Sequence, residues 1–371
     1  MIKHFNYAFR SNTSKIFNNF RFITCSSLEY KTDENLTNIN ISQLTAKIST
    51  DIKSYLNPQS EQLRDIIHYS FSASGKMIRP QIILLTAATI NYHLSIGNLS
   101  NEKLIKCNSI LSTQYQIAMI AEMIHTASLM HDDLIDCSDI RRGMLSCHKN
   151  FGPENAILGG DYILLCASQM LAKIGNCEVV SVISELINDL IKGEIMQLTS
   201  CENINGKLSH YYKKTYRKTA SLIANCCKAV ILLTNSNCPS ESAVDAAFEF
   251  GRNIGMTFQL VDDILDVTAS AEQLGKPSCG ADMKLGLATG PVLFASEKFP
   301  EIYDIISRKL SKEGDLEKVL DYINRSNGVE QTRAVARAYH DNALNILKSI
   351  TDSPYRKMLE NLSEEIFNRT K

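Results

Sequence analysis

The sequence predicts an all-α fold in a single domain. Apolar residues recur at intervals of three and four along most of the chain, as at Leu44, Ile48, Ile52 and Leu56, and this spacing places them on one face of a helix. The alternation of apolar and polar residues that is typical of strands is nowhere sustained. A chain of 371 residues with 44% hydrophobic content can also bury a full core. We therefore expect a bundle of antiparallel helices.

The helices of the first half are expected from about Ile41 onward. Pro80 suits the first turn of a helix, where its missing N–H has no partner, and a mostly apolar run to Ile90 continues that helix. The polar stretch 91–103 then indicates a loop. The helical period returns over 116–136, with carboxylates gathered at the carboxyl end of the segment. After a polar turn at 137–152, further helices are expected over 155–174, 179–198 and 208–233.

The helices of the second half begin with one that runs from about Ala243 into an acidic motif. Gly251 and Gly255 lie four residues apart in it, a spacing that indicates close approach of a neighbouring helix. Segment 275–290 is rich in Gly, Lys and Pro and is expected to form a loop that could close over a site. Behind this loop, helices are expected over 291–298, 316–326 and 328–348, with a charged one after Pro354.

The first 28 residues differ in composition from the rest of the chain. They contain Lys3, Arg10, Lys15 and Arg21 but no Asp or Glu, together with several Phe, Ser and Asn. This basic, acid-free and amphipathic composition is typical of a mitochondrial transit peptide, and a disordered tail is the alternative. We expect a transit peptide at 1–28, a linker at 29–42, a domain at 43–371 and a location in the mitochondrial matrix.

The charge and cysteine content exclude several classes of function. The net charge of −1 arises from 39 basic and 40 acidic residues and gives no general attraction to nucleic acid or to a membrane surface. The eleven cysteines lack the spacing of a zinc site. Their odd number and spacing indicate free thiols in a reducing compartment and not a set of disulfides. No stretch reaches the ~18 uninterrupted apolar residues of a spanning helix. We expect no nucleic-acid partner and at most peripheral membrane association.

Two copies of one acidic motif are the strongest chemical signal. Asp132-Asp133-Leu134-Ile135-Asp136 recurs as Asp262-Asp263-Ile264-Leu265-Asp266. Residues i and i+4 share one helix face, so Asp132 and Asp136 repel each other, as do Asp262 and Asp266. Either motif alone could be a solvated helix face, but two copies in apolar surroundings call for a cation. Mg²⁺ prefers such oxygen ligands and the phosphates of a substrate, so we expect a diphosphate site.

Basic residues near the motifs could hold phosphate groups. Arg141 and Arg142 follow the first motif, and the guanidinium fork matches phosphate oxygens. Lys76 and Arg79 stand at the start of a helix, where free N–H groups and the helix dipole favour an anion. Other polar candidates lie close to one motif or the other, namely His125, Lys218, Thr219, Gln259 and Lys276.

The ordered set of motifs resembles the trans-prenyltransferase (polyprenyl synthase) family. The similar segments are Gly75–Pro80, His125–His131, both acidic motifs, Arg141–Gly143, Lys218-Thr219, Phe258-Gln259 and Gly286–Pro291, and the resemblance covers about residues 45–371. It implies a helical bundle of the isoprenoid synthase type with a central cavity. The implied reaction is repeated condensation of isopentenyl diphosphate onto an allylic prenyl diphosphate. Within the family, the sequence resembles the catalytic subunits of mitochondrial decaprenyl and solanesyl diphosphate synthases, which serve the ubiquinone side chain.

The resemblance also implies roles for individual residues. About two to three Mg²⁺ ions would be coordinated by Asp132, Asp136 and Asp262, with Asp133, Asp263 and Asp266 in support. The allylic diphosphate would be bound by Arg141, Lys218 and Lys276, with Thr219 and Gln259 near the departing oxygen. Isopentenyl diphosphate would be bound by Lys76, Arg79, His125 and Arg142.

Product length is expected to depend on Ala127. This residue stands five positions before Asp132, with Ser128 beside it and Ile124 one turn deeper, so all three could line a tunnel for the growing chain. A bulky aromatic residue at this position would close the tunnel, as the resemblance implies for short-chain members. Because Ala127 is small, we expect an open tunnel and a long product, for which the resemblance implies roughly eight to ten isoprene units (about C40 to C50).

Two alternative functions are open on the sequence. A class I terpene cyclase would carry an Asn/Ser/Glu triad in place of the second motif and would lack the isopentenyl site. A non-catalytic regulatory subunit of the same assembly could dispense with its acids, whereas both motifs are complete here. The resemblance also implies either a homodimer or a heteromer with a degenerate second synthase subunit. One departure from many members is Cys137, which stands where they carry another Asp.

Overall fold

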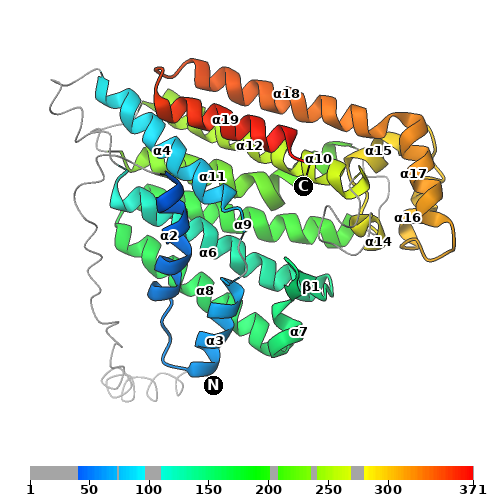
Figure 1. The fold of residues 1–371 in the computed structure, drawn as a ribbon, viewed down its shortest axis with the longest axis horizontal. Coiled ribbons are helices and arrows are strands. Elements are labelled where there is room, and N and C mark those ends of the chain that lie inside the picture. Colours follow the sequence, from blue (N-terminus) through cyan, green and yellow to red (C-terminus); the bar gives the residue numbers. More distant parts are fainter. Residues whose placement is uncertain are drawn as a thin grey trace, which may run out of the picture. The chain divides into compact units, whose positions relative to one another are not determined.

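A computed structural model of the chain describes residues 41–72, 75–96, 110–200, 208–234, 240–268 and 280–370, all of which belong to one compact unit. Within these residues the secondary structure is almost entirely helical. The one sheet there is a hairpin of two short antiparallel strands, β1 (Ile140–Arg141) and β2 (Met144–Leu145). The predicted all-α class is therefore confirmed (Figure 1).

The helices of the first part are α2 (Ile41–Tyr55), α3 (Glu61–Ser70), α4 (Ile78–Ile96), α6 (Ser112–Ile135), α7 (Cys147–Phe151), α8 (Pro153–Ile174) and α9 (Cys177–Ser200). Those of the second part are α10 (Leu208–Thr215), the π-helical turn η2 (Tyr216–Ala220), α11 (Ser221–Leu232), α12 (Glu241–Thr268), α14 (Ala281–Lys284), α15 (Gly290–Ser296), α16 (Ile302–Ser307), α17 (Asp315–Ser326), α18 (Gly328–Lys348) and α19 (Pro354–Asn368).

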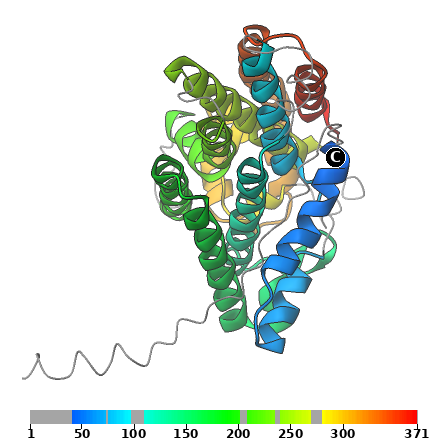
Figure 2. The same ribbon diagram turned by 90° about the vertical axis from the view of Figure 1, so that its left-hand side faces the viewer.

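The two helices that carry the acidic motifs lie on either side of α11. Helix α6 packs against α4, α8 and α11, and α12 packs against α11, α18 and α19. The largest apolar cluster joins buried residues of α2, α3, α4, α6, α8, α9, α11 and the first part of α12, while a smaller one joins α15, α16 and α17. Figure 2 shows the green helices, which include α8 and α9, toward the left-hand side of this unit. The first motif is thus attached to the main core.

Glycines set the distance between α12 and its neighbour. A Cβ atom at Gly255 would lie 2.6 Å from Cα of Ala220, and one at Gly251 would lie 2.8 Å from Cα of Ala224. Any side chain at these positions would push the two helices apart. The close approach predicted from the spacing of Gly251 and Gly255 is therefore confirmed. It brings the Lys218-Thr219 segment near the second motif.

Several predicted boundaries were wrong for identifiable reasons. The loop expected over 91–103 begins too early, because α4 continues to Ile96 and the buried Asn91 side chain bonds to Gln114. The turn expected over 137–152 contains the β1–β2 hairpin and helix α7. These elements have too few residues to show a hydrophobic period. The linker was expected to reach residue 42, whereas α2 begins at Ile41. The transit peptide predicted at 1–28 lies outside the described residues.

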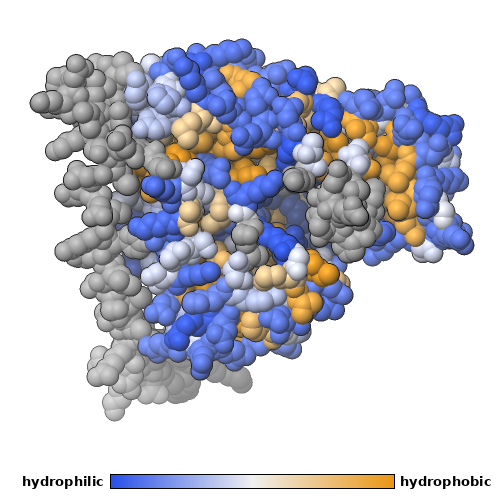
Figure 3. Space-filling model, in the orientation of Figure 1, coloured by the Kyte–Doolittle hydropathy of each residue, from blue (hydrophilic) through white to orange (hydrophobic). Residues whose placement is uncertain are grey.

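Helix α8 is the one described helix that is long and apolar enough to cross a membrane by length and composition. It packs against α6 and α7, and part of it is buried in the largest apolar cluster. A core helix of a water-soluble bundle passes the same test, so the apolarity of α8 alone is weak evidence for a membrane span. On the face shown in Figure 3, hydrophobic residues reach the surface in separate places among hydrophilic ones.

Candidate active site

A cavity of about 620 Å³ lies between the two acidic motifs. Its wall is formed by residues from α6, the β1 strand, α9, α10, η2, α12, α14 and the segment that leads into α15. The charged and polar groups in the wall include Asp132, Asp136, Arg141, Lys214, Lys218, Thr219, Gln259, Asp263 and Asp282. Both motifs therefore contribute to one space.

The first motif stands at the carboxyl end of α6. This helix ends at Ile135, where Cys137 adopts a left-handed φ of 52° and the N–H of Ser138 donates to the Asp133 carbonyl oxygen at 2.8 Å. The carboxyl end of a helix carries a partial negative charge. Asp132 and Asp136 are therefore placed where the backbone, as well as each other, disfavours an unneutralised negative charge.

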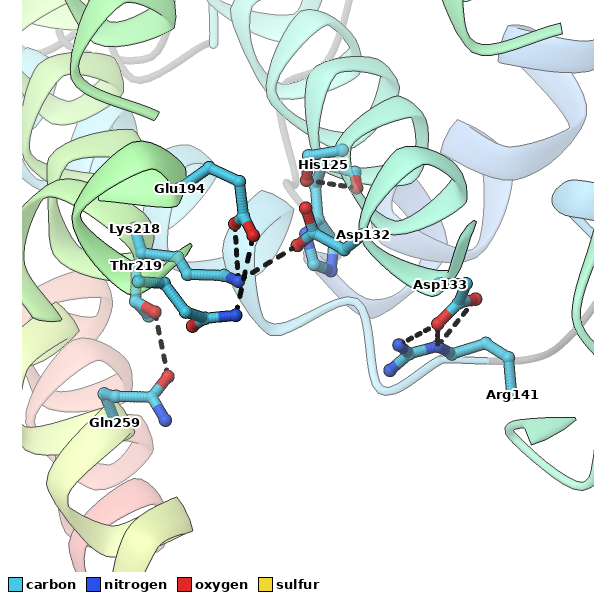
Figure 4. A network of polar contacts seen from close by, with 10 residues as sticks. His125, Asp132, Asp133, Arg141, Glu194, Lys218, Thr219 and Gln259 are labelled. Atoms are coloured by element: carbon cyan, nitrogen blue, oxygen red, sulfur yellow. Dashed lines mark hydrogen bonds and ion pairs between the residues drawn. The ribbon is translucent and has the colours of Figure 1, made fainter. Parts of the chain in front are cut away.

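Lys218 is the cation that faces Asp132. Its Nζ lies 2.6 Å from Oε2 of Glu194 and 3.6 Å from Oδ2 of Asp132 (Figure 4). Burial raises the pKa of Asp132 to about 6, and Glu194 and Asp136 add to this rise while Lys218 opposes it. Burial also raises the pKa of Asp136. These poorly solvated carboxylates favour a bound cation.

The donor set fits a hard divalent ion that is completed by substrate oxygens. Among the residues that the structure describes, no three acidic, histidine or cysteine side chains form a ready-made metal site. Mg²⁺ is usually held by one or two carboxylates, several waters and the phosphates of a substrate. Asp132 and Asp136, both in the cavity wall, match that pattern.

Asp133 points away from Asp132 and binds Arg141 (Figure 4). Nε of Arg141 donates to both carboxylate oxygens of Asp133, at 2.9 Å and 3.1 Å, and its Nη2 also contacts Oδ1. The side chain of Asp133 is only 4% exposed. Asp133 therefore holds Arg141 in the cavity wall, and its role in supporting a metal ion stays a prediction.

The three acids of the second motif have separate partners. Oδ1 of Asp262 lies 2.5 Å from Nη2 of Arg369, which also donates to the Phe258 carbonyl oxygen at 2.7 Å. Asp266 accepts from the backbone N–H groups of Ala281 and Asp282, at 3.1 Å and 3.3 Å. Asp263 is buried and lines the cavity. Of the three, Asp263 faces Asp132 and Asp136 across the cavity, and Asp262 instead lies at a neighbouring basic cluster.

That basic cluster contains Arg79, His125 and Arg142 around Phe258. Nη1 of Arg79 lies 3.0 Å from Nε2 of His125, and its guanidinium group lies 5.5 Å from the centre of the Phe258 ring. Burial lowers the pKa of His125 well below its usual value, and Arg79 and Arg142 lower it further. An arginine can only donate, so Nε2 accepts and His125 is neutral. His125 therefore orients Arg79 without adding charge.

The hairpin turn brings Arg142 to this cluster. Arg142 and Gly143 form its two central residues, with φ of 50° and 78°, as a tight two-residue hairpin requires. A Cβ atom at Gly75 would lie 2.7 Å from Nη1 of Arg142, so the glycine leaves room for the guanidinium group. Glu122 is buried close to Arg79 and Arg142. The structure thus assembles Arg79, His125 and Arg142 as predicted, whereas Lys76 is exposed at the edge.

Lys218 and Thr219 lie in the π-helical turn η2, next to Gly193 of α9. π-turns are rare and are frequent at functional sites. A Cβ atom at Gly193 would lie 2.9 Å from the backbone nitrogen of Lys218, so this glycine lets α9 approach the turn. Oγ1 of Thr219 donates to Oε1 of Gln259 at 2.8 Å (Figure 4). The polar groups predicted near the second motif therefore meet there.

The residues predicted for the product tunnel lie deeper along α6. Ala127 and Ile124 are buried in the largest apolar cluster and do not line the 620 Å³ cavity, although Leu129 does. Oγ of Ser128 donates to the His125 carbonyl oxygen at 2.9 Å. The tunnel stays a prediction. Lys276 lies outside the described residues.

Several residues of the site were not predicted from the sequence. Glu194 follows Lys192 and Gly193 on α9, which form no acidic motif, and Tyr211 lies in a segment without a recognisable signal. Arg369 reaches Asp262 only because α19 docks on α12. Each of these positions depends on tertiary packing and not on local spacing.

Comparison with known proteins relates both the fold and the motifs to one family. Residues 60–323 match the polyprenyl synthetase family model. The chain is 43% identical over 321 residues to the mouse all trans-polyprenyl-diphosphate synthase PDSS1, covering 86% of this chain and 75% of that protein. It is 38% identical over 354 residues to decaprenyl-diphosphate synthase subunit 1 of Schizosaccharomyces pombe, covering 90% and 93% of the two chains.

Solved structures agree with the sequence comparison. A heptaprenyl diphosphate synthase from Staphylococcus aureus is similar with a TM-score of 0.79 and 28% identity, covering 90% of this chain and 99% of that one. A polyprenyl synthase from Caulobacter crescentus, complexed with calcium and isoprenyl diphosphate, is similar with a TM-score of 0.77 and 25% identity, covering 89% and 96%. The predicted isoprenoid synthase type of helical bundle is therefore confirmed.

Proposed function

The chain belongs to the polyprenyl synthetase family, and from this premise we propose what its cavity binds and makes. It is a trans-prenyltransferase that uses a divalent metal and prenyl diphosphate substrates. We assign it the repeated condensation of isopentenyl diphosphate onto an allylic prenyl diphosphate. The similar decaprenyl, solanesyl and hexaprenyl synthases support a long-chain product of about C40 to C50, used for the ubiquinone side chain.

The observation that carries this assignment is the pairing of a carboxylate cavity with a separate arginine cluster. Asp132, Asp136 and Lys218 face the cavity, and Arg79 and Arg142 form the second site beside it. Two diphosphates can therefore bind next to each other with different partners. This arrangement suits transfer between an allylic diphosphate and isopentenyl diphosphate, and a terpene cyclase would need no second diphosphate site.

Ionisation of the allylic diphosphate is the step that the cavity favours. We propose that Asp132 and Asp136, together with Asp262, which pairs with Arg369 in this structure, would hold about two to three Mg²⁺ ions. Bound there, the ions would supply positive charge opposite the departing diphosphate. Lys218 and Arg141 would bind the same group, and Thr219 and Gln259 would lie near its bridging oxygen. Fixed donors of this kind are worth more in a partly desolvated cavity than in water. The isopentenyl double bond then attacks the allylic cation, and a proton is lost to the released pyrophosphate.

A Gly75→Ala variant is expected to raise KM for isopentenyl diphosphate by about tenfold, as loss of one charged hydrogen bond would, with little effect on KM for the allylic substrate. The added methyl group would displace the guanidinium group of Arg142, which is flexible, so the fold should be unaffected. Steady-state kinetics with each substrate varied in turn checks this. Equal changes in both KM values would contradict the assignment of the two diphosphates.

We propose that α8 and α9 form the interface with a second synthase chain. Leu158 and Leu165 of α8 are 62% and 57% exposed, and Ile191 and Ile195 of α9 are 57% and 55% exposed. Exposed apolar residues grouped in this way mark interaction surfaces. Glu194 lies on α9 between Ile191 and Ile195, so assembly would also stabilise its position beside Lys218. The partner is a second copy or, as the name "subunit 1" of the fission-yeast relative supports, a degenerate synthase subunit.

A Leu165→Glu variant is expected to lower the mass of the assembled protein in light scattering after gel filtration. A charge at an exposed position costs the single chain little, whereas burying it in an apolar interface costs several kcal/mol. Met358→Glu, at an exposed apolar residue of α19, is the matched control and should leave the mass unchanged. A wild-type protein that runs as a single chain, alone and with its candidate partner, would overturn the proposed interface.

We propose that the protein is mitochondrial, as the names of its relatives from rice and Yarrowia support. We propose that residues 1–28 direct it to the matrix. Fusion of these residues to a fluorescent reporter, followed by protease protection of purified mitochondria, tests this. A reporter that remains in the cytosol would contradict the transit peptide.

The catalytic assignment is tested by incubating purified full-length protein with labelled isopentenyl diphosphate, Mg²⁺ and either farnesyl or geranylgeranyl diphosphate. Products are then separated by chain length. A ladder that ends in a long polyprenyl diphosphate is expected. If no such product appears with either primer, alone or with a candidate partner subunit, the chain is a non-catalytic subunit and the proposed function fails.

A further inference from the structure

Asp263 is the meeting point of three hydrogen-bond donors from different elements. Its Oδ1 accepts from Nε2 of Gln259 at 2.9 Å, and its Oδ2 accepts from the Tyr211 hydroxyl and from the Gly290 backbone N–H, the latter at 3.4 Å. The residue is 2% exposed. These donors come from α12, from α10 and from the start of α15. Asp263 therefore links three segments of the chain around the cavity through hydrogen bonds.

We propose that Asp263 is a positioning residue for Gln259 and Thr219, and not a ligand of the metal ions. This inference rests on the proposed function, because it concerns how the allylic half of that site is held. Both of its oxygens accept hydrogen bonds from protein donors, so a metal ion would compete with these buried hydrogen bonds for the carboxylate. Any of these donors that lost the carboxylate would be left unsatisfied, which is costly in a buried place. Among the described residues, Asp132 lacks such a set of donors; its nearest cation is Lys218, at 3.6 Å, and Arg141 also acts on its charge.

The position of Asp263 fixes which way the Gln259 amide faces. Because Nε2 donates to Asp263, Oε1 is turned toward the hydroxyl of Thr219, from which it accepts at 2.8 Å. The second N–H of Gln259 is then available to an oxygen of the departing diphosphate, since Gln259 lines the cavity. A flipped amide would instead present its carbonyl oxygen to that negative charge. The orientation thus decides whether Gln259 stabilises or opposes ionisation.

The surroundings keep Asp263 in this role. Burial raises the pKa of Tyr211 well above its usual value, and the charge of Asp263 adds to this, so the phenol stays protonated and donates. A Cβ atom at Gly290 would lie 2.8 Å from Cγ2 of Thr332 and 3.3 Å from the Tyr211 oxygen. The glycine therefore lets its N–H approach the carboxylate. Because all three partners donate, only a group that accepts on both atoms satisfies them.

An Asp263→Asn variant separates the two roles, because asparagine has nearly the same shape but turns an NH₂ group toward at least one donor. We expect kcat to fall about a hundredfold, the effect of losing one preorganised donor at a developing negative charge. The Mg²⁺ concentration for half-maximal activity and KM for isopentenyl diphosphate should be unchanged. A metal ligand would instead raise the Mg²⁺ requirement.

A double-mutant cycle tests whether Asp263 acts through Gln259. The Gln259→Leu variant should lose activity to a similar degree, and the Asp263→Asn/Gln259→Leu double variant should be no worse than Gln259→Leu alone. Independent roles would give effects that multiply. Such a product of effects would overturn the inference.

Calorimetry with Mg²⁺ and pyrophosphate gives a readout that does not need turnover. Asp263→Asn should bind Mg²⁺ with pyrophosphate as the wild type does, whereas Asp132→Asn should lose this binding. Weakened binding in a folded Asp263→Asn protein would make Asp263 a metal ligand and sink the inference while leaving the proposed function intact. A wild-type protein that binds Mg²⁺ with pyrophosphate but forms no polyprenyl product would instead contradict the proposed function.

Discussion

Turnover is expected to fall at least about a thousandfold when Asp132 is replaced by alanine, as loss of a metal-binding carboxylate at a developing charge implies. Asp132 faces the cavity between Asp136 and Lys218. Its removal would leave Lys218 paired with Glu194 at 2.6 Å, so this lysine would not be available as a substitute charge. Single-turnover assays at saturating Mg²⁺ would show whether the chemical step itself is lost.

The same substitution is expected to leave the free energy of unfolding unchanged or higher. Burial raises the pKa of Asp132 to about 6, above its ordinary value of 3.8, so the folded state holds the proton more tightly than the unfolded state does. Above pH 6 the ionised side chain therefore costs stability, and alanine removes that cost. Denaturant unfolding at pH 7.5 measures it, and comparison at pH 5 should show a smaller difference between the two proteins.

Asp321→Ala is the matched control for this experiment. Asp321 lies on α17, where its exposed side chain pairs with Arg325 at 3.1 Å, and it does not line the cavity. Activity and stability should both stay close to those of the wild type, since exposed ion pairs contribute little. Near-normal activity of the Asp132→Ala protein would remove the metal assignment of the first motif.

The long helices could be predicted because one buried face imposes the same period over many turns. Helices α8, α9 and α18 begin and end within about two residues of the expected positions, as boundary scatter of this size is normal. Helices α14 and α16 contain four and six residues, too few for a period to show. Their positions are set by packing in the cluster beside α15 and α17.

The site could be predicted to the level of residue types but not of pairings. Repulsion within each motif predicts a cation, and the following arginines predict an anion, whatever the fold. The sequence could not show that Asp133 holds Arg141, because this contact depends on the hairpin that turns the chain back. Nor could the sequence show that Arg369 contacts the segment around Asp262. Arg369 also bonds to Phe258 in that segment, and the two residues are 111 positions apart. Tertiary contacts therefore distinguish the six acids from one another.

Helix α6 carries both residues of the reaction site and the residue expected to limit product length. Its last turn carries Asp132, and Asp136 follows directly after it. His125 faces the arginine cluster, and Ala127 is fully buried between His125 and Asp132. A chain that grows from the cavity and extends away from the metal site would run toward the amino-terminal end of this helix. Side-chain volume at Ala127 would then limit length without touching the reacting atoms.

An Ala127→Phe variant is consequently expected to make products shorter by several isoprene units while still catalysing condensation. The added ring would occupy the space into which the chain extends, and overpacking of the core would also cost about 1 to 3 kcal/mol of stability. Instability alone lowers the amount of product without changing its length. Chromatography of dephosphorylated products, compared at equal total incorporation, separates the two effects.

Ala295→Phe is the control with the same change in side chain. Ala295 is also fully buried, but it lies in the smaller cluster formed with α16 and α17, away from α6. This variant should lose stability and yield while its products keep the wild-type length, because its ring cannot reach the growing chain. If Ala127→Phe also kept the wild-type length, the wall of the tunnel would have to be formed by another part of the bundle.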